Sequence, residues 1–508
     1  MLKQQNVLRS AMLLTASGII AKSIDFLFRA YYSRKLGSEG MGIFSLVFAI
    51  HSIMLTFATG GLGVAVSKTV SELYAHRRSD NIRKTMRISI GSVCVLSIFV
   101  IFTTALFADQ IAEKILKEPR CAQSLIFLSP SILFMGISYC IKGYFYASRK
   151  VLRPASSEFL EQAVKITAIT KLLGMWLPKG IHHGCEAVFL GLSIGEFSSC
   201  FYLFILYIAD TRLMPGKSSS KGLASSIARI ALPVTASSLA SSALRMQEDV
   251  WIVSSLRKFG LAQADALSGY GIIHGMVMPL IVFPLTLMSS FLTLLVPEIS
   301  RADGMRSKIR LQTLTARIYR FTVFFSFLVL CVLFIFADEL SLFVYGVPKS
   351  APTLRMLSLL CPIMFIDSVS CGILNGLGKQ SSLLKYSISD SVLRLAMIYI
   401  LIPKFGINAL IFIIIASNIY TFSLTVGKVS TSVQSVFIGG KYLFRPAFAA
   451  LLTFFTVHSI FTMTVRTVTQ FSVAIGIIFS AIVYFAASAA NGALSKSDIA
   501  WLFKRLMS

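Results

Sequence analysis

Ser17 to Lys35 reads SGIIAKSIDFLFRAYYSRK, a stretch apolar enough for a membrane helix that nevertheless contains three ionisable residues. Lys22, Asp25 and Arg29 are spaced by three and four residues, so they share one helical stripe. If the helix enters the bilayer near Ala11, Lys22 lies roughly 16 Å deep, close to the midplane. A charge at that depth costs about 3 kcal/mol or more, so the stripe is expected to face a bundle interior or a watery cavity.

The stripe can be interpreted in two ways. It could be a packing triplet that neutralises its own charge inside the bundle. However, it contains two cations and one anion, and a surplus cation that faces a cavity is a natural anion site. We therefore predict that Lys22, Asp25 and Arg29 line a cavity and bind substrate, with Asp25 tuning the two cations.

The composition is that of a polytopic membrane protein. The 508 residues are 55% hydrophobic and only 14% charged, whereas a soluble protein of this length carries about 25% charged residues. The net charge of +26 would also suit nucleic acid, but it is spread over short loops, as in the basic cytoplasmic loops of membrane proteins. We therefore expect no nucleic-acid partner. The cysteines and histidines are scattered without ligand spacing, so no metal site is expected.

Apolar segments long enough to span a bilayer recur along the whole chain. They predict an all-α polytopic fold with about fourteen transmembrane helices. Lysine and arginine concentrate in alternate loops, which predicts that both termini are cytoplasmic. The fourteen segments lie at 10–32, 42–66, 87–109, 122–147, 157–178, 186–209, 226–254, 266–296, 317–337, 353–376, 383–403, 406–427, 444–464 and 470–491.

An internal repeat organises these segments. LSPSILFMGISYCIKGYFYASRK at 128–150 resembles LCPIMFIDSVSCGILNGLGKQ at 360–380. Helices 1–6 and 7–12 are therefore expected to be two copies of one six-helix unit, which is a transporter architecture when a cavity lies between the copies. The predicted domains are an N-terminal lobe at 1–215, a C-terminal lobe at 216–430, and helices 13 and 14 at 431–508.

The segment that follows the repeat carries an acid and a base at i, i+4 in both copies. The first copy has Glu161 and Lys165, and the second has Asp390 and Arg394. We expect both to be structural ion pairs that hold helices together in hydrocarbon, with a cavity-lining role as the alternative.

Three further ionisable residues lie inside apolar segments. Glu196 and Asp367 are isolated acids, which makes them candidates for carrying a coupling proton or sodium ion; a hydrogen bond to a neighbouring helix is the alternative. His274 lies in SGYGIIHGMVMPL at 268–280, and Pro279 within this string and Pro284 just after it are expected to break the helix beyond His274. Irregular backbone at that depth suits a cavity wall, so His274 is a candidate cavity residue.

Enzyme motifs are not found. The string closest to a nucleotide-binding loop runs from Gly372 to Gln380, but its glycine spacing is wrong and Gln380 replaces the magnesium-binding hydroxyl. We therefore predict a protein that is not an enzyme and has no cofactor, driven by proton or sodium coupling or by the membrane potential.

Three strings resemble a known family: GSEGMGIFSLVFA at 37–49, GLGVAVSKTVSEL at 61–73 and YGIIHGMVMPLIVFPLTLMSSFLTLLVPEIS at 270–300. Together they look like the stage V sporulation protein B branch of polysaccharide transporters, which belongs to the multidrug/oligosaccharidyl-lipid/polysaccharide flippase superfamily together with the lipid II flippases. The resemblance implies two six-helix lobes in a V around a central cavity, plus two C-terminal helices. It also implies export of an undecaprenyl-pyrophosphate-linked saccharide, a lipid II-type peptidoglycan precursor, for spore cortex in the sporulation branch.

The same resemblance implies where the pyrophosphate is held. Lipid II flippases use two arginines of the first helix, and Lys22 falls at the first position. The second of these arginine positions is occupied by Phe28 here, with Arg29 adjacent. A third family arginine lies in the eighth helix, and His274 occupies its position here. A fourth cationic position, near the end of helix 2, has no basic counterpart.

The sequence thus predicts a flippase of the bacterial cytoplasmic membrane that works by alternating access. Its partners would be the lipid-linked saccharide, the bilayer and, as a candidate only, cell-wall synthases. Two alternatives are a drug/cation antiporter of the same superfamily, which would want acids to dominate its cavity, and a non-transporting membrane scaffold for cell-wall synthesis.

Overall fold

The computed structural model describes residues 2–75, 80–212, 222–305, 307–434, 440–464 and 469–493. Within these ranges the chain is helical and no strand occurs. It forms two compact units, Met1–Gly271 and Ile272–Ser508. The predicted lobe boundaries after residues 215 and 430 stay predictions.

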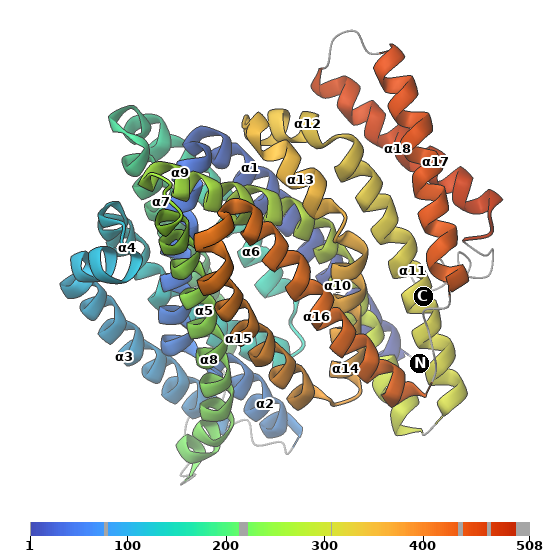
Figure 1. Cartoon of the computed structure of the whole chain (residues 1–508). Coiled ribbons are helices and arrows are strands. Elements are labelled where there is room, and N and C mark those ends of the chain that lie inside the picture. The colour runs from blue at the N-terminus through green and yellow to red at the C-terminus, as the bar shows by residue number, and fades with distance from the viewer. Residues whose placement is uncertain are drawn as a thin grey trace. The chain divides into compact units, whose positions relative to one another are not determined.

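The first unit contains long helices joined by short turns (Figure 1). The segments between α3 and α4 and between α6 and α7 include short π- and 3₁₀-helices, η1 to η3. The bounds are α1 Leu2–Thr59, α2 Leu62–Ala75, α3 Asp80–Gln110, η1 Ile111–Leu116, η2 Pro119–Cys121, α4 Ala122–Leu128, α5 Pro130–Ala147, α6 Leu152–Trp176, η3 Leu177–Lys179, α7 Ile181–Thr211, α8 Leu223–Lys258 and α9 Gln263–Tyr270.

The second unit begins within a π-helical segment, η4, which contains His274. The helix that follows runs through Pro284, so the expected break at Pro279 and Pro284 is wrong; the irregularity lies before them. The bounds are η4 Gly271–Val277, α10 Met278–Gly304, α11 Lys308–Ile335, α12 Ala337–Leu340, η5 Ser341–Tyr345, η6 Pro348–Ser350, α13 Ala351–Ser358, α14 Cys361–Gly376, α15 Gln380–Phe405, α16 Ile407–Val433, α17 Gly440–Thr464 and α18 Gln470–Ala490.

The internal repeat is visible in the order of the elements. In the first unit η1, η2, α4 and α5 follow one another as a π-helix, a 3₁₀-helix and two α-helices. In the second unit η5, η6, α13 and α14 repeat the same order. Pro130 and Pro362, which match in the sequence, both lie in the first turn of their helices, where a missing N–H costs nothing.

Ten helices among the described residues are long and apolar enough to cross a membrane, or eleven if the bent pair Pro348–Ser358 and Cys361–Gly376 forms one span. This confirms the polytopic all-α class. The predicted first and second segments fall in one run, Ser17–Ala75, within which Gly37 interrupts α1 with φ 69°, a value that favours glycine. Two further predicted segments, α6 and α15, carry several charges each. The count of fourteen spans stays a prediction.

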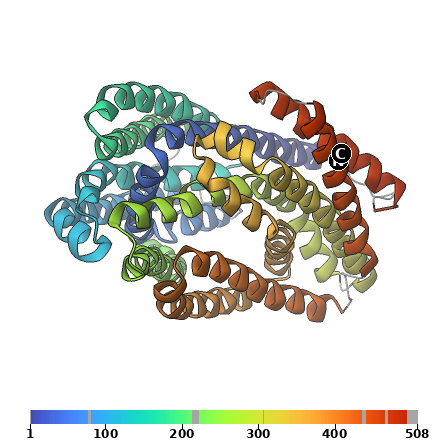
Figure 2. The same ribbon diagram turned by 45° about the horizontal axis from the view of Figure 1, so that its top comes forward.

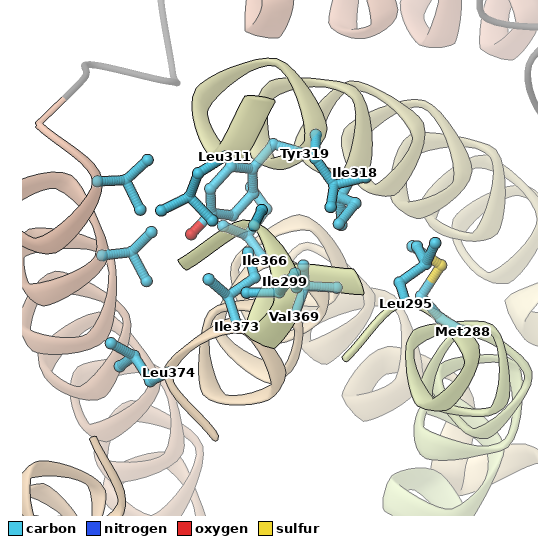
Figure 3. Packing of buried hydrophobic residues seen from close by; sticks show 14 of the residues in the cluster. Met288, Leu295, Ile299, Leu311, Ile318, Tyr319, Ile366, Val369, Ile373 and Leu374 are labelled. Carbon is cyan, nitrogen blue, oxygen red and sulfur yellow. The ribbon is translucent and has the colours of Figure 1, made fainter. Parts of the chain in front are cut away.

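Each unit has its own apolar core. In the second unit Ile318 and Tyr319 of α11 pack with Ile366 and Val369 of α14 and with Leu295 of α10 (Figure 3). The α15–α16 pair lies side by side in orange and brown (Figure 2). Since lipid tails are as apolar as these side chains, close van der Waals packing rather than the hydrophobic effect must hold such helices together in a membrane.

Close packing of α6 on α7 depends on glycine. Gly191 and Gly195 form a G-x-x-x-G pattern on α7, which lets two backbones approach. A Cβ atom at Gly191 would lie 2.4 Å from Ile169 Cγ1 and 3.0 Å from its backbone nitrogen, and one at Gly195 would lie 2.9 Å from Lys165 Cβ. These two glycines therefore set the position of the polar face of α6.

A buried carboxylate ties η2 to α1 and α9. Glu118 is 2% exposed and accepts hydrogen bonds from Arg120 Nε at 2.6 Å and Gln263 Nε2 at 2.7 Å. Arg120 also donates to Glu39 on α1 at 2.7 Å. Burial raises the pKa of Glu118, but the hydrogen bonds and the charge of Arg120 outweigh it, so the pKa lies below its usual range.

We expect Gly191→Val to lower the amount of protein in the membrane and its melting temperature. The valine must displace Ile169 and push α6 away, and overpacking of this kind costs about 1–3 kcal/mol. Gly91→Val is the matched control, because a Cβ atom at Gly91 meets nothing within 4 Å. The two variants are compared by thermal unfolding in detergent; equal melting temperatures would contradict the packing role of Gly191.

We also expect Glu118 to make stability depend on pH. A carboxyl whose folded pKa is lowered contributes stability that is present above its unfolded pKa, about 4.3, and is lost as the pH falls through the folded value. Wild-type protein should therefore lose more thermal stability than Glu118→Gln as the pH is lowered from 7 to about 3, through the unfolded pKa and into the range of the folded one. If the two show the same pH profile, the Glu118 cluster does not carry this dependence.

Candidate functional site

Lys22, Asp25 and Arg29 lie on one stripe of α1, as the sequence predicted. Lys22 and Asp25 are exposed and Arg29 is half-buried. The guanidinium of Arg29 lies over the ring of Phe44, 5.6 Å from its centroid, a distance suited to a cation–π contact. The stripe therefore presents its charged groups from one side of α1.

The carboxylate of Asp25 is paired with another helix. Lys165 Nζ of α6 lies 2.6 Å from Asp25 Oδ1, and Gln162 Nε2 donates to the same oxygen over 3.4 Å. The side chain of Lys165 is 7% exposed and that of Asp25 is 53% exposed. Asp25 thus serves as the counter-ion of a buried lysine on another helix. The spacing of Lys22, Asp25 and Arg29 along α1 did not predict this pairing.

This arrangement corrects the predicted ion pair between Glu161 and Lys165. No ion pair within 4 Å joins them among the described residues, because the ammonium of Lys165 points across the helix interface to α1. The i, i+4 spacing permits a pair within α6, but a carboxylate on the facing helix competes with it. Whether Glu161 and Lys165 stabilise the fold stays a prediction.

The two cations of the stripe are left without a counter-ion. Neither Lys22 nor Arg29 has a carboxylate within 4 Å in the part of the chain that the structure describes. Arg29 Nε is buried and makes no hydrogen bond there. Because Lys165 already pairs with Asp25, the positive surplus of the stripe is two charges, on Lys22 and Arg29, rather than one, so the stripe can attract a dianion.

A second group of charges lies between α5, α6 and α7 in the same unit. Lys142 Nζ of α5 lies 3.4 Å from Glu158 Oε1 of α6, and Glu161 and Glu196 interact electrostatically with each other and with Lys142. Glu196 follows Gly195 on α7, which packs against Lys165 and the backbone of Glu161. Glu196 therefore has acidic and basic neighbours and is not isolated.

The charged residues of the second unit form a separate group. Arg394 Nε lies 3.7 Å from Asp390 Oδ2, which confirms that these two residues pair. Ser417 of α16 donates a hydrogen bond to Asp390 over 2.6 Å. Arg394 also interacts electrostatically with His274. Asp367 accepts a hydrogen bond from Thr425 Oγ1 at 2.6 Å. Asp367 therefore has a partner on a neighbouring helix, which was the alternative to its role as a carrier of a coupling ion.

The structure thus brings Lys22, Asp25 and Arg29 together with Lys165, and His274 together with Arg394. These two groups belong to different units, and a common site for them stays a prediction.

Two cavities were not predicted from the sequence. One, of about 670 Å³, lies in the first unit and is lined by polar residues including Ser67, Lys68, Tyr139, Lys142, Tyr146 and Glu158. Another, of about 480 Å³, lies in the second unit between α11 and α17, beside Leu359 at the end of α13, and is lined by apolar side chains. The string at 61–73 carried a signal for the first, because Ser67, Lys68 and Ser71 follow one helical face, but cavities form only once helices have packed.

Comparisons with known proteins agree with this architecture. Stage V sporulation protein B of Bacillus subtilis (strain 168) is 27% identical over 418 residues, which is 80% of each chain. Lipid II flippase MurJ of the same organism is 23% identical over 214 residues, covering 40% of this chain and 39% of MurJ.

Solved structures show the same fold. Lipid II flippase MurJ in an inward closed conformation matches with a TM-score of 0.73 and 14% identity, over 94% of this chain and 98% of the other. An inward-facing multidrug resistance transporter of the MATE family matches with a TM-score of 0.65 and 14% identity, over 83% and 98%. The activities in these names are those of flippases and transporters, which confirms the prediction that the chain is not an enzyme.

Family models place the chain directly. A model described as MatE matches residues 233–400. A model described as polysaccharide biosynthesis protein matches residues 7–303, more than half of the chain. The chain therefore belongs to the polysaccharide biosynthesis protein family, within the multidrug/oligosaccharidyl-lipid/polysaccharide flippase superfamily.

Proposed function

We propose that this protein is a flippase that moves an undecaprenyl-pyrophosphate-linked saccharide, of the lipid II type, from the inner to the outer leaflet of the bacterial cytoplasmic membrane. The observation that carries the proposal is the uncompensated pair of cations on α1. Lys22 and Arg29 have no carboxylate within 4 Å among the described residues, because Asp25 is bound to Lys165.

A pyrophosphate suits these two cations. It is a compact polyanion with several acceptor oxygens, and charge-assisted hydrogen bonds to lysine and arginine are about twice as strong as neutral ones. Its charge cannot cross hydrocarbon unaided, whereas the polyprenyl tail is at home there.

Export of the anion gains energy from the membrane potential. With the inside negative, each negative charge moved outward is favoured by about 2.3 kcal/mol per 100 mV. Alternating access then requires a reset step. A proton or sodium ion carried by Glu196 or Asp367 could drive it, since both acids lie inside apolar helices and each has polar neighbours.

The alternatives differ in what they need from the stripe. A drug/cation antiporter would bind cationic substrates, and the positive charges of Lys22 and Arg29 would repel them. A membrane scaffold for cell-wall synthases would need no charge on α1 at all. The likeness to stage V sporulation protein B over 80% of the chain favours a peptidoglycan precursor, with spore cortex as its destination.

The first prediction tests the stripe by charge. In a flippase-depleted cell that depends on this protein, Lys22→Ala should abolish rescue, because it removes half of the surplus charge. Lys22→Arg should retain rescue, since the charge persists and guanidinium binds phosphate oxygens bidentately. Growth is normalised to the amount of protein in the membrane. If Lys22→Ala rescues like wild type while Lys22→Arg does not, Lys22 is a steric packing element.

The second prediction tests the partner of Lys165. Lys165→Ala should reduce rescue more than abundance, because it frees the exposed Asp25 carboxylate to neutralise Lys22 or Arg29. Asp25→Ala combined with Lys165→Ala should recover rescue. Glu161→Ala combined with Lys165→Ala is the matched control and should recover less, and equal recovery by both double variants would show that Asp25 is not the functional partner.

The third prediction concerns orientation. Ser79 and Ser350 are natural labelling positions from the sequence, but Ser79 lies outside the described residues and Ser350 is buried. Glu72 and Lys349 are exposed, so Glu72→Cys and Lys349→Cys are better choices in a chain whose eight free cysteines are replaced. An impermeant thiol reagent should label Lys349→Cys from outside and Glu72→Cys only after permeabilisation. Labelling of both from one side would contradict the proposed topology.

A further inference from the structure

The polar cavity of the first unit is a separate feature from the α1 stripe. It lies between α2, α5 and α6 and has a volume of about 670 Å³, which falls within the range of small-molecule sites. Close packing of two glycines builds one of its walls. A Cβ atom at Gly143 of α5 would lie 2.7 Å from the carbonyl oxygen of Gly63. The backbones of α2 and α5 are therefore in direct contact at these glycines, and the longer side chains of the lining surround the cavity beside this contact.

Four side chains of the cavity lining have no partner within the described part of the protein. Ser67, Lys68, Tyr139 and Tyr146 line it, and their side chains make no hydrogen bond or ion pair within the described ranges. Lys142 lies deeper, 17% exposed, and is held by Glu158 at 3.4 Å. Lys68, Tyr139 and Tyr146 are exposed, so their polar groups are open to a ligand that enters the cavity.

The chemistry of this lining suits an acidic sugar. Serine and tyrosine hydroxyls and the Glu158 carboxylate can exchange hydrogen bonds with sugar hydroxyls, and the exposed faces of Tyr139 and Tyr146 can stack on the apolar face of a sugar ring. Glu158, Glu161 and Glu196 already surround Lys142 with negative charge, so Lys68, which is exposed, is the cation of the lining that can meet a negative charge on the ligand. A neutral sugar or a bare anion would each leave part of this lining unused.

Helix α6 connects the cavity to the cations of α1. Glu158 lines the cavity, and Lys165, seven residues later, binds Asp25. Seven residues are two helical turns, so both lie on one face of α6, about 10 Å apart along its axis. One or two sugar rings attached to a phosphate span such a distance.

We propose that this cavity, bordered by Ser67, Lys68, Tyr139, Lys142 and Glu158, is a saccharide subsite that binds a sugar bearing a phosphate or carboxylate group. The proposal rests on the proposed function and adds to it: the pyrophosphate lies at Lys22 and Arg29, and the saccharide of the same lipid-linked molecule occupies the cavity. Lys68 is the cation that recognises the acidic group, and Lys142 is oriented by Glu158.

Calorimetry on the purified full chain in detergent tests the subsite directly. The probes are N-acetylglucosamine 1-phosphate, N-acetylglucosamine and inorganic phosphate, and the chain carries Lys22→Ala so that the α1 stripe contributes less. The sugar phosphate should bind more tightly than either half. Adding Lys68→Ala should weaken it by about tenfold, since a hydrogen bond to a charged group is lost, whereas Lys68→Arg should restore it.

Lys114→Ala is the matched control, because Lys114 is exposed and does not line the cavity; it should leave affinity unchanged. Two results would overturn the subsite: no effect of Lys68→Ala, or phosphate binding as tightly as the sugar phosphate. Transport of the lipid-linked saccharide, measured with the single variants, separates the two proposals. If Lys22→Ala abolishes transport but Lys68→Ala leaves sugar-phosphate affinity unchanged, the subsite is wrong and the flippase stands. If Lys22→Ala transports normally, the proposed function itself fails.

Discussion

The ion pair between Asp25 and Lys165 is the interaction on which the proposed chemistry of the first unit depends. A buried lysine is costly unless a carboxylate compensates it, and Lys165 finds that carboxylate on α1 rather than on its own helix. The pair fastens α6 to α1 and removes the only acid from the α1 stripe. Lys22 and Arg29 are left as a cationic surface, so a structural requirement of α6 produces the charge that a pyrophosphate needs.

Helix packing makes that pair available. Gly191 and Gly195 let α6 lie directly against α7, and this close approach fixes which residues of α6 face α1 and which line the polar cavity. The face that contains Glu158, Gln162 and Lys165 then runs from the cavity to the stripe. This one face of α6 thus links the cavity to the cations of α1, which are the two parts of the proposed substrate site.

Much of this could be predicted from the sequence. The stripe on α1 follows from the spacing of Lys22, Asp25 and Arg29, and the i, i+4 pair of Asp390 and Arg394 is present as expected. The repeat of Pro130 and Pro362 marks equivalent helices in the two units. Local spacing carries these features, and local spacing is visible in a sequence.

The features that were missed depend on contacts between helices. Lys165 had a suitable acid at i−4, and nothing in the sequence shows that a residue 140 positions away competes for it. The polar cavity requires α2, α5 and α6 to meet, and its residues look like ordinary interface or loop residues in the sequence. The sequence predicted a break at Pro279 and Pro284, but the π-helical segment that contains His274 continues directly into α10.

The most direct test of the central claim is a leaflet-accessibility assay in proteoliposomes in which this protein is the only flippase. Two labelled lipids are compared, a pyrophosphate-linked saccharide and a neutral glycolipid with the same polyprenyl chain and sugar. The account predicts that the protein moves only the pyrophosphate-linked lipid, and that Lys22→Ala combined with Arg29→Ala stops this movement at unchanged protein levels. Equal movement of both lipids, or full activity of the double variant, would contradict it.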